Sequence, residues 1–337
     1  MKAFIFERNG EPADVLAIRD LPDPVPGSGE LLVRVLLSPV NPSDLHVIRG
    51  RFGRQPALPA SPGLECVGVV QTLGPGTQGP VPGTRVVLVD VPGSWRELMV
   101  CPAERVVPVP DEVSDEDAAQ ALVNPVTAWV LTMVEHRMQR GEWLTQTAAG
   151  STVGRLILQL ARSEGFRTIN IVYRRAQAAE IAELGGDVTL CTEDDDWPAQ
   201  LVKASGGTGP SKAIDCVAGR IGAELARALA PGGRILVFGA LSSHRQTERS
   251  AFEMPIFGPG LIYSAATLQG WFLFHWLAAT SLPQCVSVLR NVLDRLASGA
   301  IRLPPARRYS VTQIREALRD AEASGRDGKP LLDFNRY

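Results

Sequence analysis

A turn of small residues in the middle of the chain has the residue types and spacing of a phosphate-binding site. Residues 147–154 read Thr-Ala-Ala-Gly-Ser-Thr-Val-Gly and lead into the apolar run Leu-Ile-Leu-Gln-Leu-Ala at 156–161. The apolar run predicts a helix, whose N-terminus carries partial positive charge and unpaired backbone N–H groups. A turn with little side-chain bulk lets these groups approach a pyrophosphate. We therefore predict that the phosphates of a dinucleotide are held by Gly150, Ser151, Thr152, Val153 and Gly154.

The residues that follow this turn by about 20 positions distinguish between the two common nicotinamide dinucleotides, since NAD-binding folds place an acid there for the ribose 2′-OH. Here the stretch 171–175 reads Ile-Val-Tyr-Arg-Arg and contains no acid. Guanidinium groups bind phosphate bidentately. We therefore predict that Arg174 and Arg175 bind the 2′-phosphate of NADPH. The alternative is that the two arginines are solvated side chains at a helix start.

Apolar strands and helices alternate around this turn from Trp143 onward. This alternation predicts a doubly wound parallel sheet with helices on both faces, the Rossmann architecture. Strands are expected at 143–145, 169–173, 188–191, 213–217, 235–239 and 267–271, and the clearest helices at 154–164, 177–184 and 221–230. The acidic run at 193–196 is expected to be a solvated loop.

The segment before Ser114 is instead rich in short β-branched runs separated by Pro and Gly, which predicts a small barrel or sandwich. Its strands are expected at 31–37, 66–73, 84–89 and 98–101. Ser114 precedes three acids and is typical of a helix N-cap, so the next ~20 residues are expected to be helical. The tail is expected to add helices at 282–296 and 312–323 and a strand at 330–334.

Composition excludes several classes of protein. The 337 residues suggest about two domains, and the 34 basic and 36 acidic side chains give a net charge of -2. A general nucleic-acid partner is therefore not expected. No apolar run approaches the ~20 residues of a membrane helix, and the N-terminus does not resemble a secretory signal, so we expect a cytoplasmic protein without a membrane partner.

The cysteines are scattered and form no Cys-x-x-Cys pair, which argues against a disulfide scaffold or a structural zinc module and suits a reducing compartment. They are Cys66, Cys101, Cys191, Cys216 and Cys285.

Several stretches along nearly the whole chain resemble the medium-chain dehydrogenase/reductase superfamily. They are Pro-Val-Asn-Pro-Ser-Asp-Leu at 39–45, Gly-Ser-Trp-Arg at 93–96, Val-Asn-Pro-Val-Thr-Ala-Trp at 123–129, Arg-Thr-Ile-Asn-Ile-Val at 167–172, Asp-Cys-Val-Ala-Gly at 215–219 and Gly-Trp-Phe at 270–272. Within it, the chain is most similar to the mitochondrial-type 2-enoyl thioester reductases, with zinc-free quinone oxidoreductases next. The resemblance implies an α/β protein with a β-rich GroES-like catalytic domain (1–119), a Rossmann NADPH-binding domain (120–271) and a return to the first domain (272–337).

The resemblance also bears on metal binding. Zinc-dependent members have a Cys where this chain has Asn41, and a His where it has Leu64. Neither side chain replaces a thiolate or imidazole on Zn²⁺, so no metal is expected. On this interpretation His46 and Glu65 are isolated remnants of the zinc motif.

The resemblance assigns further cofactor roles. It implies that Asn41 and Thr127 orient the nicotinamide ring and that Lys329 lies near the cofactor. It also implies that Tyr173, with Arg174 and Arg175, meets the adenosine phosphate. The residues implied to line the cofactor site are Phe238, Gly239, Ala240, Leu241, Trp271, Phe272 and Leu273. Two alternatives stay open: Trp271 as plain core and Lys329 as a surface charge.

The chain differs from the enoyl thioester reductases at the residue that would donate the proton. Enoyl thioester reductases carry a Tyr where this chain has Phe52, in the stretch Ile-Arg-Gly-Arg-Phe-Gly at 48–53. A phenylalanine has no proton to give. Either another group supplies it (water, His46 or Tyr263), or the substrate is a quinone that solvent can protonate.

Three functions follow as hypotheses. The first is an NADPH-dependent reductase of an electron-poor C=C bond in a 2-enoyl thioester or a small α,β-unsaturated carbonyl. The second is an NADPH:quinone oxidoreductase, and the third is an NADPH-binding sensor or structural protein with little catalysis. The resemblance also implies a homodimer, in which the strand at 267–271 pairs with its copy across a two-fold axis. The apolar stretch 272–279 then lies at the interface or in the core.

Overall fold

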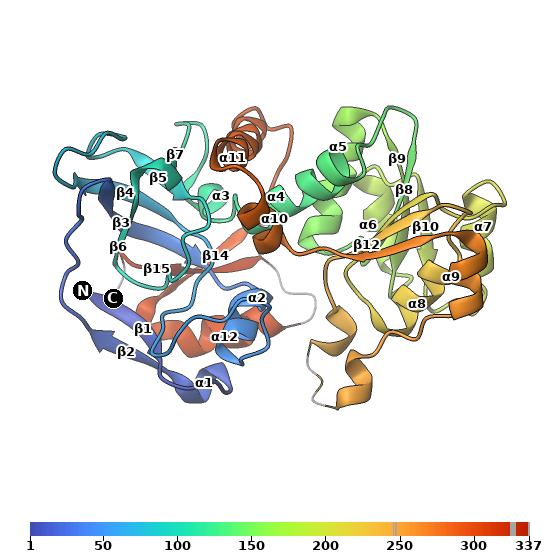
Figure 1. Cartoon of the computed structure of the whole chain (residues 1–337), viewed down its shortest axis with the longest axis horizontal. Coiled ribbons are helices and arrows are strands. Elements are labelled where there is room, and N and C mark those ends of the chain that lie inside the picture. Colours follow the sequence, from blue (N-terminus) through green and yellow to red (C-terminus); the bar gives the residue numbers. More distant parts are fainter. Residues whose placement is uncertain (245, 247, 324–327, 336–337) are drawn as a thin grey trace. The chain divides into compact units, whose positions relative to one another are not determined.

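The structure, a computed structural model, describes residues 1–244, 246, 248–323 and 328–335 (Figure 1). The chain forms two compact units: unit 1 is Met1–Val126 with Leu277–Tyr337, and unit 2 is Thr127–Trp276. The chain crosses between them inside helices α4 (Val123–Trp129) and α10 (Leu273–Ala279). Among the described residues, no helix is long and apolar enough to span a bilayer.

Unit 1 is β-rich. Its seven-stranded sheet has the order β14-β15-β3-β4-β5-β7, with β6 paired to β3, and β1 and β2 form a separate antiparallel pair. The strands are β1 (Lys2–Phe6), β2 (Leu16–Asp20), β3 (Glu30–Pro39), β4 (Val67–Leu73), β5 (Arg85–Leu88), β6 (Leu98–Pro102), β7 (Val106–Pro108), β14 (Ala306–Ser310) and β15 (Lys329–Asp333). The four strands expected before Ser114 and the closing strand are all present.

The helices of unit 1 lie between these strands. They are α1 (Pro12–Val15), α2 (Pro42–Ile48), α3 (Asp115–Ala119), α11 (Leu282–Ala297) and α12 (Ile314–Glu322), with short 3-10 turns at η1 (Ala103–Arg105) and η5 (Val311–Gln313). In the core, the Phe4 ring packs edge-on against Trp95 at 6.2 Å and against Phe334 at 6.5 Å. The first strand and the last described residues therefore share one core.

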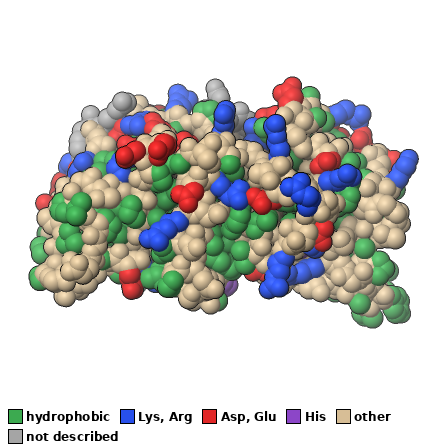
Figure 2. Space-filling model, turned by 90° about the horizontal axis from the view of Figure 1, so that it is seen from above, with side chains coloured by type: hydrophobic (Ala, Val, Ile, Leu, Met, Phe, Trp, Pro, Cys, Tyr) green, Lys and Arg blue, Asp and Glu red, His purple; other side chains and the backbone are tan. Residues whose placement is uncertain are grey.

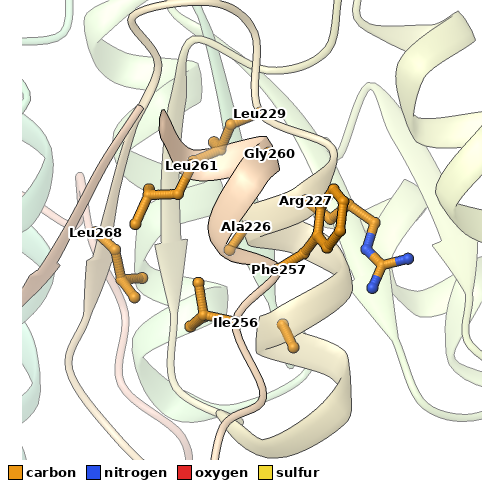
Figure 3. A pocket seen from close by; sticks show the side chains of 9 residues that line it. Ala226, Arg227, Leu229, Ile256, Phe257, Gly260, Leu261 and Leu268 are labelled. Atoms are coloured by element: carbon orange, nitrogen blue, oxygen red, sulfur yellow. The ribbon is translucent and has the colours of Figure 1, made fainter. Parts of the chain in front are cut away.

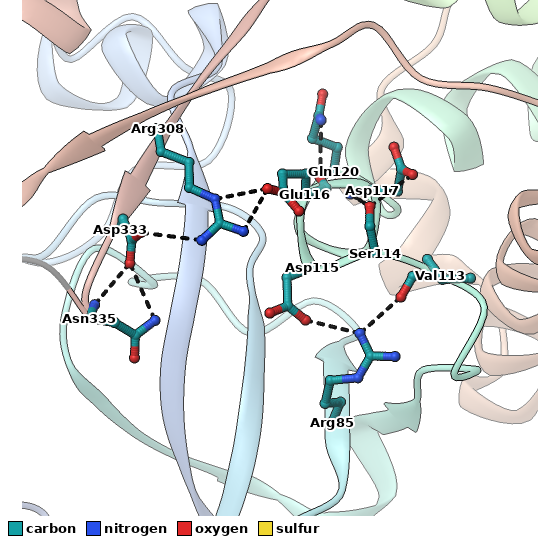
Figure 4. Close-up of polar contacts among 10 residues, drawn as sticks. All are labelled: Arg85, Val113, Ser114, Asp115, Glu116, Asp117, Gln120, Arg308, Asp333 and Asn335. Atoms are coloured by element: carbon teal, nitrogen blue, oxygen red, sulfur yellow. Dashed lines mark hydrogen bonds and ion pairs between the residues drawn. The ribbon is translucent and has the colours of Figure 1, made fainter.

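Ion pairs anchor α3 to strands from both segments of unit 1 (Figure 4). Glu116 accepts hydrogen bonds from Arg308 of β14 at 2.6 and 2.8 Å, and Arg308 also pairs with Asp333 of β15 at 3.4 Å. Asp115 accepts a hydrogen bond from Arg85 of β5 at 2.9 Å. The acidic first turn of α3 thus contacts cations from two distant parts of the chain, besides favouring the helix N-terminus.

The ~20 residues after Ser114 are largely helical, as expected, but the helical run is interrupted. Ser114 is indeed the N-cap, since its Oγ accepts the Asp117 N–H at 3.1 Å, but α3 ends at Ala119. A new helix, α4, begins at Val123 and runs into a π-helical segment, Val130–Glu135. The break has a physical cause: the buried carboxylate of Glu65 accepts the N–H groups of Leu122 and Val123, which a continuous helix would bond internally.

Unit 2 is the expected parallel sheet. Its strand order is β10-β9-β8-β11-β12-β13, and every neighbouring pair is parallel. The strands are β8 (Trp143–Thr147), β9 (Arg167–Val172), β10 (Val188–Cys191), β11 (Lys212–Asp215), β12 (Arg234–Val237) and β13 (Thr267–Gly270). The strand order reverses between β8 and β11, and such a switch point is where ligands bind in open α/β sheets.

Helices cover both faces of this sheet. They are α5 (Thr152–Glu164), α6 (Gln177–Glu183), α7 (Trp197–Ala204), α8 (Gly219–Arg227) and α9 (Gly258–Ser264), with 3-10 turns at η3 (Leu241–Ser243) and η4 (Arg249–Phe252). Ile169 and Ile171 pack with residues of α7 and α8, whereas Val172 packs with residues of α5 and α6. Because neighbouring strand residues point to opposite faces, the two helix pairs lie on opposite sides.

Charges of both signs are mixed on the surface. On the face shown in Figure 2, Lys and Arg side chains lie among Asp and Glu side chains, in keeping with the net charge of -2. The five cysteines are free thiols and all are buried.

Candidate active site

The turn after β8 has the geometry that a phosphate site requires. Ser151 is the N-cap of α5, and its Oγ accepts the Gly154 N–H at 3.1 Å. A Cβ on Gly154 would lie 2.5 Å from the Ala149 carbonyl oxygen and 2.7 Å from its Cα. Only glycine therefore lets α5 pack this closely on the turn, and the first turn of the helix keeps N–H groups for an anion.

A buried carboxylate holds the neighbouring loop after β11. The Asp215 side chain accepts hydrogen bonds from the Thr147 hydroxyl at 2.5 Å, from the Val217 N–H at 2.9 Å and from the Ala218 N–H at 3.0 Å. Burial raises the pKa of Asp215, and these three donors oppose that shift. Asp215 thereby ties the end of β8 to the loop at the switch point, a role that its sequence motif did not reveal.

The expected cofactor residues after β12 lie beside the same loop. The Phe238 N–H donates to the Asp215 carbonyl at 2.8 Å, and the Leu241 N–H donates to the Cys216 carbonyl at 2.9 Å. A Cβ on Gly239 would lie 3.0 Å from the Cys216 carbonyl oxygen. Ala240 and Leu241 are exposed. The structure thus brings residues 238–241 to the edge of the sheet formed by the carboxyl ends of its strands. The same edge carries the turn at residues 147–154 that is predicted to bind phosphate, here called the phosphate turn.

The two arginines after β9 differ in their surroundings. The Arg174 guanidinium is exposed, and its backbone N–H donates to Gln177 Oε1 at 3.2 Å. The Arg175 guanidinium forms an ion pair with Asp194, and its backbone N–H donates to Glu193 Oε2 at 3.1 Å. The run at 193–196 is a largely exposed turn, as expected, in which Glu193 and Asp194 contact Arg175. Tyr173, before the arginines, is 70% exposed.

The aromatic stretch after β13 is largely buried. Trp271 is 9% exposed, and its indole N–H has no hydrogen-bond acceptor among the described residues. Its backbone N–H donates to the Val237 carbonyl at 2.8 Å, which places it beside the end of β12. Phe272 stacks edge-on against His275 at 5.0 Å, and Leu273 is buried. Thr127 is buried in α4, also within unit 2.

Unit 1 contains a buried polar cluster centred on Asn41. Lys329 donates to Asn41 Oδ1 at 2.5 Å, and Asn41 Nδ2 donates to Glu65 Oε1 at 2.9 Å. The Asn41 backbone N–H donates to Asp44 at 2.7 Å. None of these four side chains is more than 2% exposed, so Lys329 is not a surface charge.

Glu65 holds this cluster together and is not an isolated remnant. Besides Asn41, its carboxylate accepts the Leu122 N–H at 3.0 Å and the Val123 N–H at 2.8 Å. Burial raises the pKa of Glu65, while these donors and the nearby Lys329 ammonium favour its charged form. Burial likewise raises the pKa of Asp44 to about 7, although Lys329 opposes the shift. One buried cation thus lies near two buried carboxyl groups.

The donor set here does not fit zinc. The Asn41 carboxamide oxygen is bonded to the Lys329 ammonium, a cation that would repel Zn²⁺, and Leu64 has no donor atom. In the described parts of the chain, no three His, Cys, Asp or Glu side chains are grouped for a metal. Phe52 is partly buried, and its carbonyl accepts a hydrogen bond from Gln55 at 3.1 Å.

A small pocket in unit 2 shares no residue with these groups (Figure 3). It lies between α8, α9 and β13, and the Arg227 guanidinium lies over the Phe257 ring at 5.3 Å from its centre. Its volume of about 20 Å³ has room for one water molecule. We therefore assign it no ligand.

Family models and curated relatives match both units. The alcohol dehydrogenase GroES-like domain matches residues 27–111, and zinc-binding dehydrogenase matches residues 152–290. Mitochondrial enoyl-[acyl-carrier-protein] reductase of Xenopus tropicalis is 29% identical over 98% of this chain and 95% of its own length. The Homo sapiens protein of that name is 28% identical over 94% of this chain and 84% of its own.

Solved structures match the fold over the same extent. A Bacillus thuringiensis protein described as an NADPH:quinone reductase superposes with a TM-score of 0.90 at 28% identity, covering 98% of both chains. A mycobacterial protein solved in complex with NADPH has a TM-score of 0.84 at 29% identity, over 99% of this chain and 100% of its own.

A GroES-like unit together with a Rossmann unit defines an oxidoreductase of the class that uses a nicotinamide dinucleotide. The chain belongs to the medium-chain dehydrogenase/reductase superfamily, and it lacks the signature of the zinc site.

Proposed function

We propose that this protein is an NADPH-dependent, zinc-free reductase that delivers hydride to an electron-poor C=C bond of a 2-enoyl thioester or a small α,β-unsaturated carbonyl. The observation that carries the proposal is the phosphate turn at the switch point, where Gly154 packs α5 onto the turn. The relatives named as enoyl reductases, which match over nearly the whole chain, support the substrate class.

Each group of residues has a distinct part in this proposal. The backbone N–H groups of Thr152 and Val153 bind the pyrophosphate, since those of Ser151 and Gly154 already donate within the turn, and Arg174 binds the 2′-phosphate. The bound cofactor supplies the hydride, so the protein must supply orientation and electrostatics. Lys329 and Glu65 fix the carboxamide of Asn41 from opposite ends, which suits Asn41 to orient the nicotinamide ring. Hydride attack on the β-carbon places charge on the carbonyl oxygen, which hydrogen-bond donors must stabilise.

A turnover assay tests the proposal. NADPH oxidation is measured with a crotonyl thioester, an acrylate-type acid and a naphthoquinone. We expect the highest kcat/KM with the thioester or another unsaturated carbonyl compound. Preference for the naphthoquinone would replace this function with the second one, and tight NADPH binding without turnover on any acceptor would favour a binding protein.

Quinone reduction is the second candidate, because a specific residue favours it. Phe52 offers no phenolic proton, and a reduced quinone can take its protons from solvent. The Bacillus thuringiensis protein with this fold is also described as a quinone reductase.

The cofactor has its own test. Changing Arg174 and Arg175 together to Ala should weaken NADPH binding at least ~10-fold more than NADH binding, because a charge-assisted bond to phosphate is lost. Isothermal titration of the intact protein measures both affinities. Equal losses would overturn the phosphate assignment.

We also propose that the protein is a homodimer. β13 is the edge strand of the sheet in unit 2, and Thr267, Gln269 and Gly270 on it are exposed. An exposed edge presents unpaired N–H and C=O groups that a second copy can pair. Sedimentation equilibrium should give twice the 36.2 kDa chain mass, and a monomer at micromolar concentration would contradict the proposal.

A further inference from the structure

The corner of unit 2 that carries the two arginines also carries an acidic turn. β9 and β10 are parallel neighbours, with Val172 paired to Cys191, and the Thr192 N–H donates to the Val172 carbonyl at 2.9 Å. The residues that follow the two strands therefore lie side by side. The acidic run Glu-Asp-Asp-Asp at 193–196, which follows β10, therefore lies near the two arginines that follow β9.

Two of these carboxylates contact Arg175. Asp194 pairs with its guanidinium, and Glu193 accepts its backbone N–H. The Asp194 side chain is 27% exposed and the Arg175 side chain 71%, so the carboxylate is the more fixed partner. Arg174 has no such partner among the contacts of the described residues, and its backbone N–H is held by Gln177.

We propose that Asp194 is a specificity-determining residue that weakens the preference of this site for a 2′-phosphate. The inference rests on the proposed dinucleotide function. Asp194 supplies, from the turn that follows the neighbouring strand β10, the acid that is missing after β9. It competes with phosphate for Arg175 and repels a group that carries about two negative charges. Arg174 remains as the phosphate ligand, and the site accepts both NADPH and NADH, with NADPH bound more tightly by a small factor.

The chain offers a matched control for this effect. Asp195 is exposed, has the same charge and follows Asp194 directly, but it has no ion pair with Arg175 among the described contacts. Asp194→Asn and Asp195→Asn therefore remove the same charge, and only the first frees the guanidinium. A general effect of removing one negative charge would change phosphate binding in both variants, whereas release of Arg175 would change it only in Asp194→Asn.

The experiment titrates the intact protein with 2′,5′-ADP and 5′-AMP, which differ only in the 2′-phosphate. Asp194→Asn should tighten 2′,5′-ADP by about threefold to fivefold, the range of an exposed ion pair, and leave 5′-AMP unchanged or weaker. Asp195→Asn should change both by less than ~2-fold. In an Arg175→Ala background, the gain from Asp194→Asn should shrink to that of Asp195→Asn.

Three outcomes would overturn the inference: equal gains from both Asn variants, weaker 2′,5′-ADP binding in Asp194→Asn, or a gain that persists without Arg175. Failure of the proposed dinucleotide binding is distinguishable, because the wild-type protein would then bind neither NADPH nor NADH; failure of the proposed substrate class appears only in the turnover assay and leaves this titration unaffected. Circular dichroism of each variant checks that the surface substitution leaves the fold intact.

Discussion

The Lys329 ammonium group donates a hydrogen bond to the Asn41 side chain across 288 residues of sequence. Strand pairing makes this contact possible. β15 runs antiparallel to β3, with Leu331 paired to Pro39, and the Val40 N–H donates to the Pro330 carbonyl at 2.9 Å. The register of these two strands therefore delivers Lys329 to the start of α2, where Asn41 is the N-cap.

Lys329→Met should destabilise unit 1. It removes the only cation bonded to Asn41 among the described contacts and leaves two buried carboxyl groups without a countercharge. Breaking a buried ionic group in this way costs about 3 kcal/mol or more. Urea unfolding followed by circular dichroism measures the loss. Lys203→Met, at an exposed position, is the control and should cost under ~0.5 kcal/mol; an equal cost for both would contradict the prediction.

Asp44→Asn should change how stability depends on pH. The pKa of Asp44 is raised by burial from 3.8 to about 7, so the folded state binds more protons than the unfolded state between these values. Stability of the wild-type protein therefore falls as pH rises through this window. Asparagine does not ionise, and its oxygen can still accept the Asn41 N–H. Relative to wild type, the variant should gain at least ~1 kcal/mol between pH 5 and pH 8.

Urea unfolding at the two pH values tests this prediction. A constant difference between variant and wild type would show that the Asp44 carboxyl does not titrate in this range. Glu112→Gln is a suitable control, since this carboxyl is exposed.

Much of unit 2 was predictable because its signals are local. The apolar run at 188–191 is β10, and the small-residue turn leads into α5 as expected. The helix after Ser114 was not predictable in full, because its break depends on Glu65, a residue far away in sequence. Helix and strand patterns report on neighbours along the chain, whereas a buried carboxylate from another segment can cap any helix it reaches.

In the candidate site too, features encoded locally in the sequence were predictable, and contacts between distant residues were not. The phosphate turn and the arginines were visible in the sequence, but Asp194 reaches Arg175 only because β9 and β10 are adjacent in the sheet. The sequence analysis interpreted Glu65 as a remnant of a zinc motif. Its hydrogen bond with Asn41 could not be predicted, because the two residues are 24 positions apart and meet only in the folded unit. Lys329 could be assigned only by resemblance, since its burial follows from the pairing of β15 with β3.

Gly154→Ala should damage the phosphate turn. The added methyl group would meet the Ala149 backbone at 2.5 Å, and backbone atoms cannot step aside as a flexible side chain can. We expect a loss of about 1–3 kcal/mol in the free energy of unfolding and weaker dinucleotide binding. Gly150→Ala is the comparison, since its methyl would meet mainly the end of the Gln177 side chain. Equal destabilisation by both variants would argue against close packing of α5 on the turn.

Phe52→Tyr should raise turnover with an enoyl thioester. A general acid is commonly worth 10²–10⁴ in rate, so even a poorly aligned phenol should increase kcat about 10-fold. Steady-state kinetics with crotonyl thioester and with naphthoquinone separate the effects, because only the first reaction needs the phenolic proton. Unchanged kcat for the thioester would mean that another group delivers the proton.

The insertion of unit 2 between the two segments of unit 1 has a consequence for biosynthesis. The ribosome completes unit 2 before it makes β15. Until then, the backbone groups at the end of β3 that pair with β15 have no partner strand. Asn41, Asp44 and Glu65 lack their cation until then as well, because Lys329 is synthesised after the whole of unit 2. A nascent chain stalled after α11 would therefore hold a complete Rossmann unit and a GroES-like unit that still lacks β14, α12 and β15.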